Sequence, residues 1–361
     1  MIRAERPFVP APKTGQFTLP LTLEQMNRFD TIIDVRSPAE FAEDHLPGAI
    51  NLPVLTNEQR ITVGTLYKQS SAFDAKKVGA ALVARNIAGH VENCLLDKPK
   101  SWKPLVYCWR GGSRSGAMAH ILRSIGWGAL QLEGGYKAWR GQVIADLELL
   151  PAGFTYQVIC GRTGSGKSRL LEALAADGHQ VLDLEKLAAH KGSVLGELPD
   201  EAQPAQKMFE SRIWLALSGF SPDRPVYVEA ESKKVGALRV PESLIRCMRQ
   251  SACYEVVTPA ALRIKLLREE YTHLIANPAL LFDKLDCLVA LHSAERIEAW
   301  KTLARQEKWD EFVAQMLEQH YDPAYSRSMF RNFVAAEGAK PLPVDVIDTE
   351  GFSRIAATLP A

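Results

Sequence analysis

The sequence predicts an α/β protein with two parallel-sheet domains, the second of which carries a helical C-terminal region. From residue 31 onward, short apolar runs alternate with amphipathic helical patterns, as in parallel α/β units. The 361 residues exceed the size at which a single hydrophobic core keeps growing. A break at Pro151-Ala152-Gly153 separates two such series of strands and helices. We therefore place the domains at residues 1–150 and 151–361.

The first domain begins with an apolar run at residues 31–35, which predicts a buried strand. Ser37, Pro38 and Glu40 then start a helix, because a capping serine, an early proline and a third-position glutamate favour a helix N-terminus. Strands are predicted at residues 48–52 and 104–107, with a mostly helical stretch between them. A helix with apolar residues at helical spacing follows at residues 114–126.

The second domain begins with a predicted strand at residues 155–159 and a helix at residues 167–176. Further strands are predicted at residues 180–184, 225–229 and 253–257, and helices between them. Residues 260–331 have an almost entirely helical pattern. The tail at residues 344–348 is a candidate closing strand.

The composition is 47% hydrophobic and 24% charged, with a net charge of +1, which is typical of a globular protein. The six cysteines are scattered without a Cys-x-x-Cys pair, which argues against a zinc site or a disulfide framework. No apolar run is long enough to span a bilayer, and the N-terminus lacks the apolar core of a secretory signal. We expect a cytoplasmic monomer without a membrane partner.

Cys108 opens a glycine-rich run that extends to Ser115, between a predicted strand and a predicted helix. Amides of such a loop converge on one point, where the helix N-terminus adds positive charge and favours an anion or a thiolate. Arg110 and Arg114 add further positive charge, and a thiolate is the nucleophilic form of cysteine. We predict that Cys108, Arg110 and Arg114 form a catalytic site.

A second loop, from Gly161 to Ser168, matches the whole pattern of a P-loop and also lies between a predicted strand and a helix. Its backbone amides would cradle phosphates, its lysine would neutralise them, and its last serine could bind Mg²⁺. This motif predicts a polyphosphate ligand without specifying adenine. The predicted phosphate-binding residues are Gly161, Gly164, Ser165, Gly166, Lys167 and Ser168.

A P-loop enzyme also needs an acidic side chain at the end of a neighbouring strand to organise metal and water. Asp183 follows one apolar run, and Glu229 and Glu231 follow another. We take these three carboxylates as candidates, with Mg²⁺ as a possible ion at Ser168. A separate stretch, from Lys233 to Arg268, holds eight basic residues against two acidic ones, and this surplus could face a phosphate backbone.

Three segments of the first domain resemble the rhodanese family: residues 34–41, residues 45–53 and residues 133–139. In that family the loop cysteine accepts sulfur or selenium and passes it on, which implies this role for Cys108. Arg114 lies six residues after Cys108, whereas sulfurtransferase loops of the family have the arginine at the fifth residue. The cysteine phosphatases of the superfamily share the longer spacing. A wider loop could seat selenophosphate or serve phosphatase chemistry, and the spacing alone leaves both open.

The succession of a rhodanese unit and a P-loop unit, together with residues 228–236, resembles the tRNA 2-selenouridine synthase family. The similarity runs from about residue 31 to the C-terminal helices. It implies replacement of sulfur by selenium at C2 of wobble uridine 34 in tRNAs that contain 2-thiouridine. Geranyl diphosphate would first alkylate the sulfur, and selenophosphate would then supply selenium. Both are co-substrates, so no tightly bound cofactor is expected.

The resemblance also implies roles for the two loops. Lys167 and its loop would hold the diphosphate of geranyl diphosphate, and Cys108 would carry selenium as a selenosulfide. A tRNA partner would need basic side chains for its phosphates. The candidates are Lys233, Lys234, Arg239, Arg263, Arg268, Arg327 and Arg331.

Two other functions fit the same pair of loops. An ATP-dependent sulfurtransferase or a rhodanese-kinase fusion would bind a nucleotide at the P-loop and deliver sulfur from Cys108. A non-enzymatic sensor would instead use Cys108 as a switch that acts on the second domain.

Overall fold

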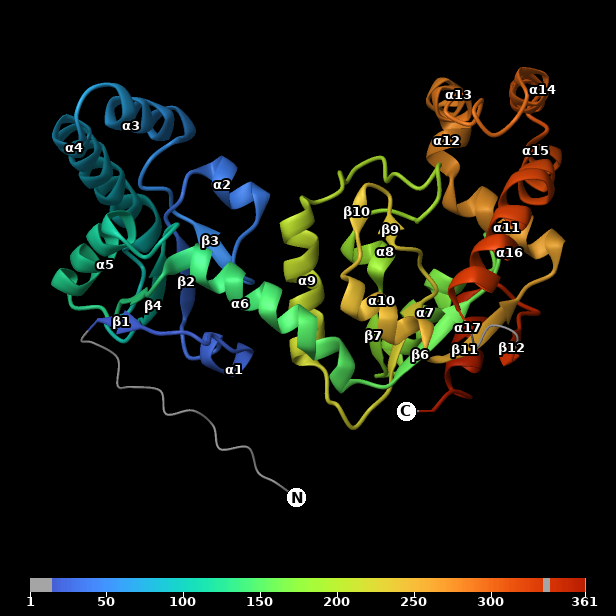
Figure 1. Ribbon diagram of the computed structural model, residues 1–361, viewed down its shortest axis with the longest axis horizontal. Coiled ribbons are helices and arrows are strands. Elements are labelled where there is room, and N and C mark those ends of the chain that lie inside the picture. The colour runs from blue at the N-terminus through green and yellow to red at the C-terminus, as the bar shows by residue number, and fades with distance from the viewer. Residues whose placement is uncertain (1–14, 334–337, 361) are drawn as a thin grey trace. The chain divides into compact units, whose positions relative to one another are not determined.

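The computed structural model describes residues 15–333 and 338–360, with the backbone alone for residues 328–332 (Figure 1). Contacts divide the chain into two units, Met1–Asp146 and Leu147–Ala361. Each unit contains a five-stranded parallel sheet flanked by helices. The predicted α/β class with two parallel sheets is therefore confirmed.

The sheet of the first unit has the strand order β1-β5-β4-β2-β3. Its strands are β1 (Gln16–Phe17), β2 (Thr31–Asp34), β3 (Ala49–Asn51), β4 (Pro104–Tyr107) and β5 (Leu130–Leu132). Its helices are α1 (Leu23–Met26), α2 (Pro38–Glu43), α3 (Asn57–Gln69), α4 (Ala72–His90), α5 (Ser113–Ile125) and α6 (Gly135–Leu149), and a π-helical turn, Val91–Leu95, extends α4. Because β4 lies at the centre of this sheet, its carboxyl end places Cys108 over the middle of the unit.

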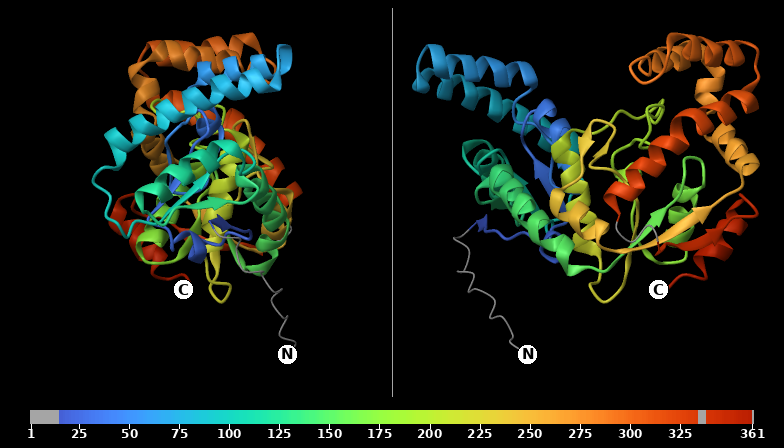
Figure 2. Two further views of the ribbon diagram at one scale, coloured as in Figure 1. Left: turned by 90° about the vertical axis from the view of Figure 1, so that its left-hand side faces the viewer. Right: turned by 45° about the vertical axis from the view of Figure 1, so that its right-hand side comes forward.

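The core of the first unit packs Ile33 and Val106 of the sheet against Met118 and Leu122 of α5. Ile87 of α4 belongs to the same cluster, which joins the sheet to the helices inserted between β3 and β4. These two helices, α3 and α4, lie side by side as a hairpin (Figure 2). Thr56 and Ser71 cap their N-termini by accepting hydrogen bonds from backbone amides three residues later.

The sheet of the second unit has the order β12-β11-β6-β8-β7. Its strands are β6 (Tyr156–Cys160), β7 (Gln180–Leu182), β8 (Val226–Glu229), β11 (Ala252–Val257) and β12 (Lys340–Pro343), with a separate antiparallel pair, β9 (Lys234–Val235) and β10 (Leu238–Arg239). Strand β6 is central and leads into the P-loop. This arrangement places the P-loop beside the carboxyl ends of β8 and β11.

The helices of the second unit include α7 (Lys167–Ala176), α8 (Leu184–Leu187), α9 (Gln206–Gly219), α10 (Glu242–Arg249), α11 (Ala260–Glu270), α12 (Thr272–Ala276), α13 (Pro278–Asp286), α14 (Ala294–Arg305), α15 (Trp309–Met316), α16 (Asp322–Asn332) and α17 (Thr349–Ala356). Two short turns complete the set, a 3₁₀ turn at Leu150–Gly153 and a π-helical turn at Leu317–Tyr321. Helices α11 to α16 confirm the predicted helical region. Leu281, Trp300 and Phe312 form part of its own apolar core.

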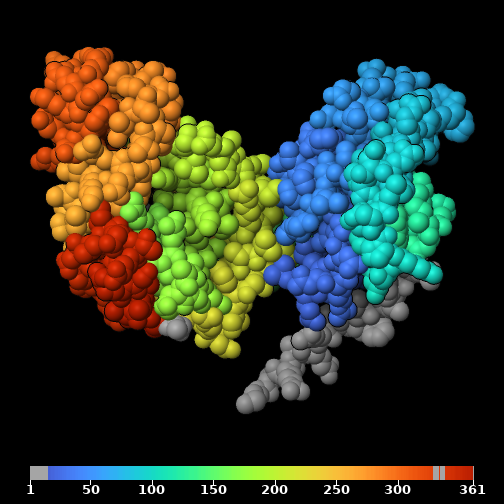
Figure 3. Space-filling view, turned by 180° about the vertical axis from the view of Figure 1, so that it is seen from behind, coloured from blue at the N-terminus to red at the C-terminus, as the bar shows by residue number. Residues whose placement is uncertain are grey.

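The tail differs from the predicted strand at residues 344–348. The strand β12 lies earlier and contains Pro341 and Pro343, which are tolerated because β12 is an edge strand of the sheet. The apolar residues Val344 and Ile347 instead join the core that surrounds Phe352 of α17. Helix α17 packs against α7, and Figure 3 shows this C-terminal segment beside the residues that follow the P-loop.

Candidate functional site

The Cys108 thiol lies at the carboxyl end of β4 and is buried, with 3% of the residue exposed. Ser115, in the first turn of α5, donates a hydrogen bond from its hydroxyl to the Cys108 sulfur over 3.1 Å. The Gln131 side-chain amide donates to the Ser115 hydroxyl oxygen over 2.9 Å. With its oxygen occupied in this way, Ser115 can direct its hydrogen to the Cys108 sulfur or to the Gly112 carbonyl oxygen, which lies 3.3 Å away.

Neither Ser115 nor Gln131 was predicted as a site residue. Ser115 directly follows Arg114 in the loop, so the loop pattern itself could have drawn attention to it. Gln131 lies on β5, and no local signal marks it. Its amide also donates to the carbonyl oxygens of Gly111 and Gly112, over 2.6 and 3.0 Å, and so fixes the glycine part of the loop.

The start of α6 supports the other half of the cysteine loop. The amides of Tyr136 and Lys137 donate to the carbonyl oxygens of Cys108 and Trp109, each over 2.9 Å. Gly135 has a φ of +57°, and a Cβ there would collide with the Cys108 carbonyl and the Gly111 amide. Only glycine allows this close backbone approach. The segment at residues 133–139 thus holds the cysteine loop in place.

Arg114 forms an ion pair with Glu40 of α2, with 2.9 Å between Nη1 and Oε2. Burial opposes ionisation of Glu40, but Arg114 outweighs it and lowers the pKa of this carboxyl below its usual value. Arg110 is exposed beside the loop. A role of either arginine in binding an anion stays a prediction, while the pair with Glu40 fixes the position of Arg114.

A buried ion pair under the loop joins β2 to α6. Arg36 and Asp34 are at most 1% exposed, and 2.6 Å separates Nη2 of Arg36 from Oδ2 of Asp34. The Arg36 guanidinium carbon also lies 4.0 Å from the centre of the Tyr136 ring. The Tyr136 hydroxyl donates to Asp44 over 2.8 Å. Because each charge and hydroxyl has a partner, this network can fix the start of α6 without the cost of an isolated buried charge.

The P-loop connects β6 to α7. Gly164 and Gly166 have φ values of +75° and +90°, and a Cβ at these positions would meet Leu267 and Phe352, respectively. The loop therefore requires glycine for both its backbone conformation and its packing. The Lys167 ammonium donates to the carbonyl oxygen of Gly161 over 2.8 Å. Lys167 thus lies across the loop, where a phosphate would bind.

Helix α16 contacts the P-loop from the helical region. The Gly161 amide donates to the Tyr325 hydroxyl oxygen over 2.6 Å. Asp322 accepts hydrogen bonds from the guanidinium of Arg263, over 2.6 and 3.0 Å, and lies 3.3 Å from Arg162. Tyr325 and Asp322 lie some 160 residues from the P-loop in sequence, so no local pattern could have identified them.

Arg263 requires a correction. It was predicted to contact tRNA, but only 5% of it is exposed, and its guanidinium also donates to the Thr163 carbonyl over 2.9 Å. We therefore assign Arg263 to the support of the P-loop and remove it from the tRNA-binding candidates.

Four carboxylates gather beside the P-loop. Asp183 caps α8, and the Glu229 side chain accepts a hydrogen bond from the Glu185 amide over 2.7 Å. The Glu185 carboxylate accepts a hydrogen bond from the Ser168 hydroxyl over 3.2 Å. It also shares a side-chain hydrogen bond with the Glu231 carboxyl. Glu185 was not predicted, because a glutamate in a short helix carries no distinguishing signal. The structure brings it together with all three predicted acids.

Burial and mutual repulsion disfavour ionisation of these carboxyls. Burial is the main cause, and it raises the pKa values of Asp183, Glu185 and Glu229 and raises the pKa of Glu231 to about 8. Among the described residues, no group of three or more His, Cys, Asp or Glu side chains is arranged to hold a metal ion by itself. Ser168 and Glu185 fit Mg²⁺ only if ligand oxygens complete the coordination.

This cluster predicts a pH-dependent stability. The native carboxyls keep protons that the unfolded chain releases above the ordinary glutamate pKa of 4.5, so stability should fall as pH rises from about 4.5 toward 8. Replacing Glu229 by glutamine should therefore raise the thermal unfolding midpoint by a few degrees at pH 8 and by less at pH 5. Thermal unfolding at both pH values checks this, with the exposed Glu201→Gln as control. An equal loss of stability at both pH values would contradict it.

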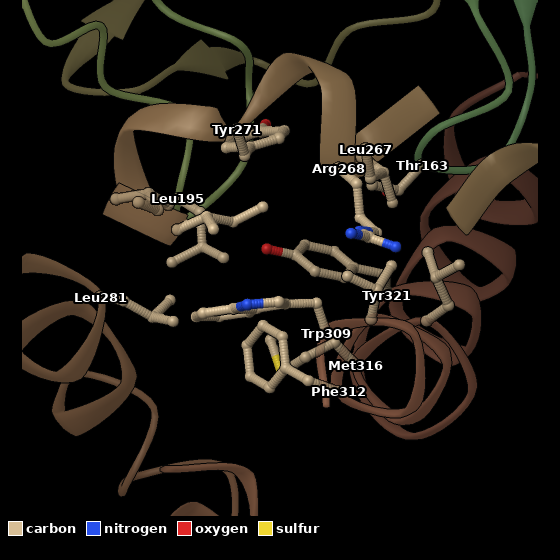
Figure 4. Close-up of a pocket in the computed structure, with 14 residues that line it drawn as sticks. Thr163, Leu195, Leu267, Arg268, Tyr271, Leu281, Trp309, Phe312, Met316 and Tyr321 are labelled. Carbon is tan, nitrogen blue, oxygen red and sulfur yellow. The ribbon is translucent and has the colours of Figure 1, made fainter. Parts of the chain in front are cut away.

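Two neighbouring cavities lie against the P-loop. The first, of about 400 Å³, is lined by polar groups that include Lys167, Ser168, Glu185 and Glu231. The second, of about 60 Å³, is lined mostly by apolar side chains of α11, α12, α13, α15 and the turn that follows α15 (Figure 4). The shared wall of the two cavities consists of Thr163, Leu267, Tyr271 and Tyr321.

The apolar cavity has aromatic side chains at its centre. Figure 4 shows Trp309, Phe312 and Tyr321 facing a common space, with Leu195 and Leu281 on its other sides. A volume of 60 Å³ corresponds to roughly four or five water-sized spheres. Such a space, next to a phosphate-binding loop, suits a small hydrocarbon group attached to a phosphate.

The remaining tRNA-binding candidates occupy different settings. Lys234, Arg239 and Arg327 are exposed, whereas Lys233 and Arg268 form surface ion pairs with Glu242 and Asp310. The side chain of Arg331 lies outside the described part of the structure. Within that part, no helix is both long and apolar enough to cross a membrane.

Comparisons with known proteins match both units. A rhodanese-like domain model matches residues 20–142, and a model described as the tRNA 2-selenouridine synthase AAA domain matches residues 154–292. A rhodanese-related protein from Thermoplasma volcanium is 19% identical, with a TM-score of 0.22 over 33% of this chain and 83% of that one.

Two curated relatives carry the name tRNA 2-selenouridine synthase. That of Nitrosomonas europaea is 37% identical over 66% of this chain, and the match spans 63% of the relative, which is less than two thirds of its length. That of Alcanivorax borkumensis is 31% identical, and the match covers 83% of this chain and 90% of the relative. Because the second of these relatives is more than 30% identical and is matched over nine tenths of its length, the chain belongs to the tRNA 2-selenouridine synthase family.

Proposed function

We propose that this protein replaces sulfur by selenium at C2 of the wobble 2-thiouridine of tRNA, first by geranylating the sulfur and then by selenation. The observation that carries the proposal is the pair of neighbouring cavities at the P-loop, one polar and one apolar, in a chain that also holds a buried cysteine loop. The apolar cavity beside the phosphate site suits the hydrocarbon part of an alkyl diphosphate. The names of the curated relatives support the selenation step.

In the first step the sulfur of 2-thiouridine attacks C1 of geranyl diphosphate. The C1–O bond breaks, diphosphate leaves, and N3 of the base loses its proton. Lys167 and the loop amides would stabilise the charge that develops on the diphosphate. Mg²⁺, held by Ser168 and Glu185 together with diphosphate oxygens, would supply further neutralisation.

The hydrocarbon chain would extend from the P-loop into the apolar cavity. Its size suits about one isoprene unit, and Thr163 and Tyr321 line the passage from the polar cavity. Burial of the chain away from water would contribute about 0.8 kcal/mol for each CH₂ group. The chain would also orient C1 toward the incoming sulfur.

In the second step the Cys108 sulfur attacks the phosphorus of selenophosphate, which breaks the P–Se bond and leaves an S-phosphocysteine. The released selenide attacks C2 of the alkylated base and the C2–S bond breaks, and water then hydrolyses the S-phosphocysteine to free Cys108 and phosphate. A selenosulfide on Cys108 would instead need an oxidant, because the selenium of selenophosphate is already at the level of selenide. Geranylthiol leaves, which is a better leaving group than the sulfide that an unmodified thiocarbonyl would release. The loop glycines, Arg110 and Arg114 would bind the phosphate part of the donor. Ser115 would hold the Cys108 sulfur in position through its hydrogen bond.

The proposal is tested by incubating the protein with 2-thiouridine tRNA, geranyl diphosphate and selenophosphate. Mass spectrometry of the digested nucleosides should then show both S-geranyl-2-thiouridine and 2-selenouridine. Without selenophosphate, the geranylated nucleoside alone should accumulate. If neither nucleoside forms and the protein instead hydrolyses ATP in the presence of Mg²⁺, the chain has a nucleotide-dependent function.

The apolar cavity predicts a preference for chain length. Replacing Leu195 by tryptophan should fill part of the cavity and raise the KM for geranyl diphosphate by about tenfold or more, with a smaller effect on dimethylallyl diphosphate. Leu195 is buried in the cavity wall. Leu291, between α13 and α14, is 69% exposed and provides the control Leu291→Trp. Steady-state kinetics with both diphosphates measures this. Equal changes for the two donors would contradict a chain-binding cavity.

A further inference from the structure

A groove lies beside the cysteine loop in the first unit, between the α3–α4 hairpin and the start of α5. Its volume is about 470 Å³. The hairpin is inserted between β3 and β4 and projects from the sheet (Figure 2). Of the residues that line it, only Arg114 takes part in the steps described above.

The groove combines an apolar floor with basic side chains. Leu55, Val63 and Val83 are among the apolar residues that line it, and Tyr67 leaves 61% of its surface exposed there. The basic residues that line it are Arg60, Lys76 and Arg114. None of the described residues lining the groove is acidic. Its surface therefore complements a ligand that joins a hydrocarbon to a polyanion.

The groove borders the start of α5, where the cysteine loop ends. Ser113 and Arg114, at the start of α5, line it, and the next residue, Ser115, contacts the Cys108 sulfur at 3.1 Å. Arg114 and Arg60 both lie near the Glu40 carboxylate, at 2.9 and 3.9 Å, which ties the groove to the helix that flanks the loop. A group bound in the groove would therefore lie close to Cys108.

We propose that this groove binds the geranyl chain of S-geranylated tRNA while C2 of the base faces Cys108. The inference rests on the proposed function, because only that function gives tRNA a hydrocarbon chain at the reacting base. The apolar floor would take the chain, and Lys76 and Arg60 would contact tRNA phosphates. The groove would thus distinguish the geranylated intermediate from unmodified 2-thiouridine tRNA and hold the departing geranylthiol.

A binding experiment without co-substrates tests this. The full chain is titrated with fluorescent anticodon stem-loop RNAs that carry 2-thiouridine or its S-methyl, S-dimethylallyl or S-geranyl derivative at the wobble position. Affinity should rise along this series, by about tenfold or more from the first to the last. Since neither selenophosphate nor geranyl diphosphate is present, no turnover interferes.

Two neighbouring alanines of α4 provide matched variants. Ala80 is exposed and lines the groove, whereas Ala81 is exposed but is not among the lining residues. Ala80→Phe should flatten the rise in affinity, and Ala81→Phe should preserve it. Tyr67→Ala, which removes an exposed wall without filling the groove, should also weaken binding of the S-geranyl RNA.

The outcomes separate this inference from the proposed function. A flat series for the unmodified protein, or an equal rise for Ala80→Phe and Ala81→Phe, would overturn the groove assignment even if the complete reaction proceeds. If the complete reaction yields neither modified nucleoside, the proposed function fails by itself. If affinity rises along the RNA series for the unmodified protein and for Ala81→Phe but not for Ala80→Phe, the groove is the site that binds the chain.

Discussion

Replacement of Cys108 by serine should abolish formation of 2-selenouridine and leave geranylation intact. Serine keeps the size of the side chain but lacks the sulfur nucleophile that would release selenide from selenophosphate, so we expect selenation to fall by at least about 10³-fold. The variant should accumulate S-geranyl-2-thiouridine when both co-substrates are present. Mass spectrometry of digested tRNA measures both nucleosides in one experiment.

The exposed cysteine of the same unit, Cys94, provides the control for this substitution. Cys94→Ser should make both products at the rate of the unmodified protein. Loss of geranylation in Cys108→Ser would mean that the two steps share one site. Selenation that survives in this variant would remove Cys108 from the reaction.

Replacement of Lys167 by alanine should remove geranylation and spare selenation of tRNA that is already geranylated. The Lys167 ammonium lies across the P-loop, 2.8 Å from the Gly161 carbonyl oxygen, and its loss leaves the departing diphosphate without its main positive charge. We expect geranyl transfer to fall by about 10²–10³-fold. Single-turnover assays with geranyl diphosphate would measure the first step, and S-geranylated RNA with selenophosphate would measure the second.

Lys186 offers a matched control because it is an exposed lysine on the neighbouring helix α8. Lys186→Ala should retain both activities. Geranyl transfer by Lys167→Ala at the unmodified rate would exclude the P-loop as the diphosphate site. Loss of the second step alone would assign Lys167 to selenophosphate.

The sequence predicted the parts of each site that are built from adjacent residues. Helix α7 begins at Lys167 and strand β4 spans residues 104–107, as predicted, because a glycine loop between an apolar strand and an amphipathic helix leaves few other conformations. The parallel arrangement of both sheets also follows from the alternation of strands and helices. Local pattern and fold agree in these regions.

The contacts that complete the sites join residues distant in sequence. Gln131 reaches the cysteine loop across the sheet, and Tyr325 reaches Gly161 from α16. Glu185 becomes part of the carboxylate cluster only when β7 pairs with β8. Pairing and packing of this kind depend on the whole fold, so propensity and spacing could not reveal them.

Arg263 illustrates the same limit for charge. A surplus of basic residues in sequence predicted an exposed surface, but the fold buries this arginine against Asp322 and Thr163. The carboxylate that pairs with it comes from another helix, α16. Lys234, Arg239 and Arg327 are exposed, and their contact with tRNA stays a prediction.

In the proposed reaction both loops act in sequence on one base. A time course with 2-thiouridine tRNA and both co-substrates, with nucleosides quantified by mass spectrometry, tests this order. We predict that S-geranyl-2-thiouridine rises first and then falls as 2-selenouridine appears after a lag, and that no 2-selenouridine forms when geranyl diphosphate is omitted. Formation of 2-selenouridine without geranyl diphosphate, at the same rate and without a lag, would contradict the account.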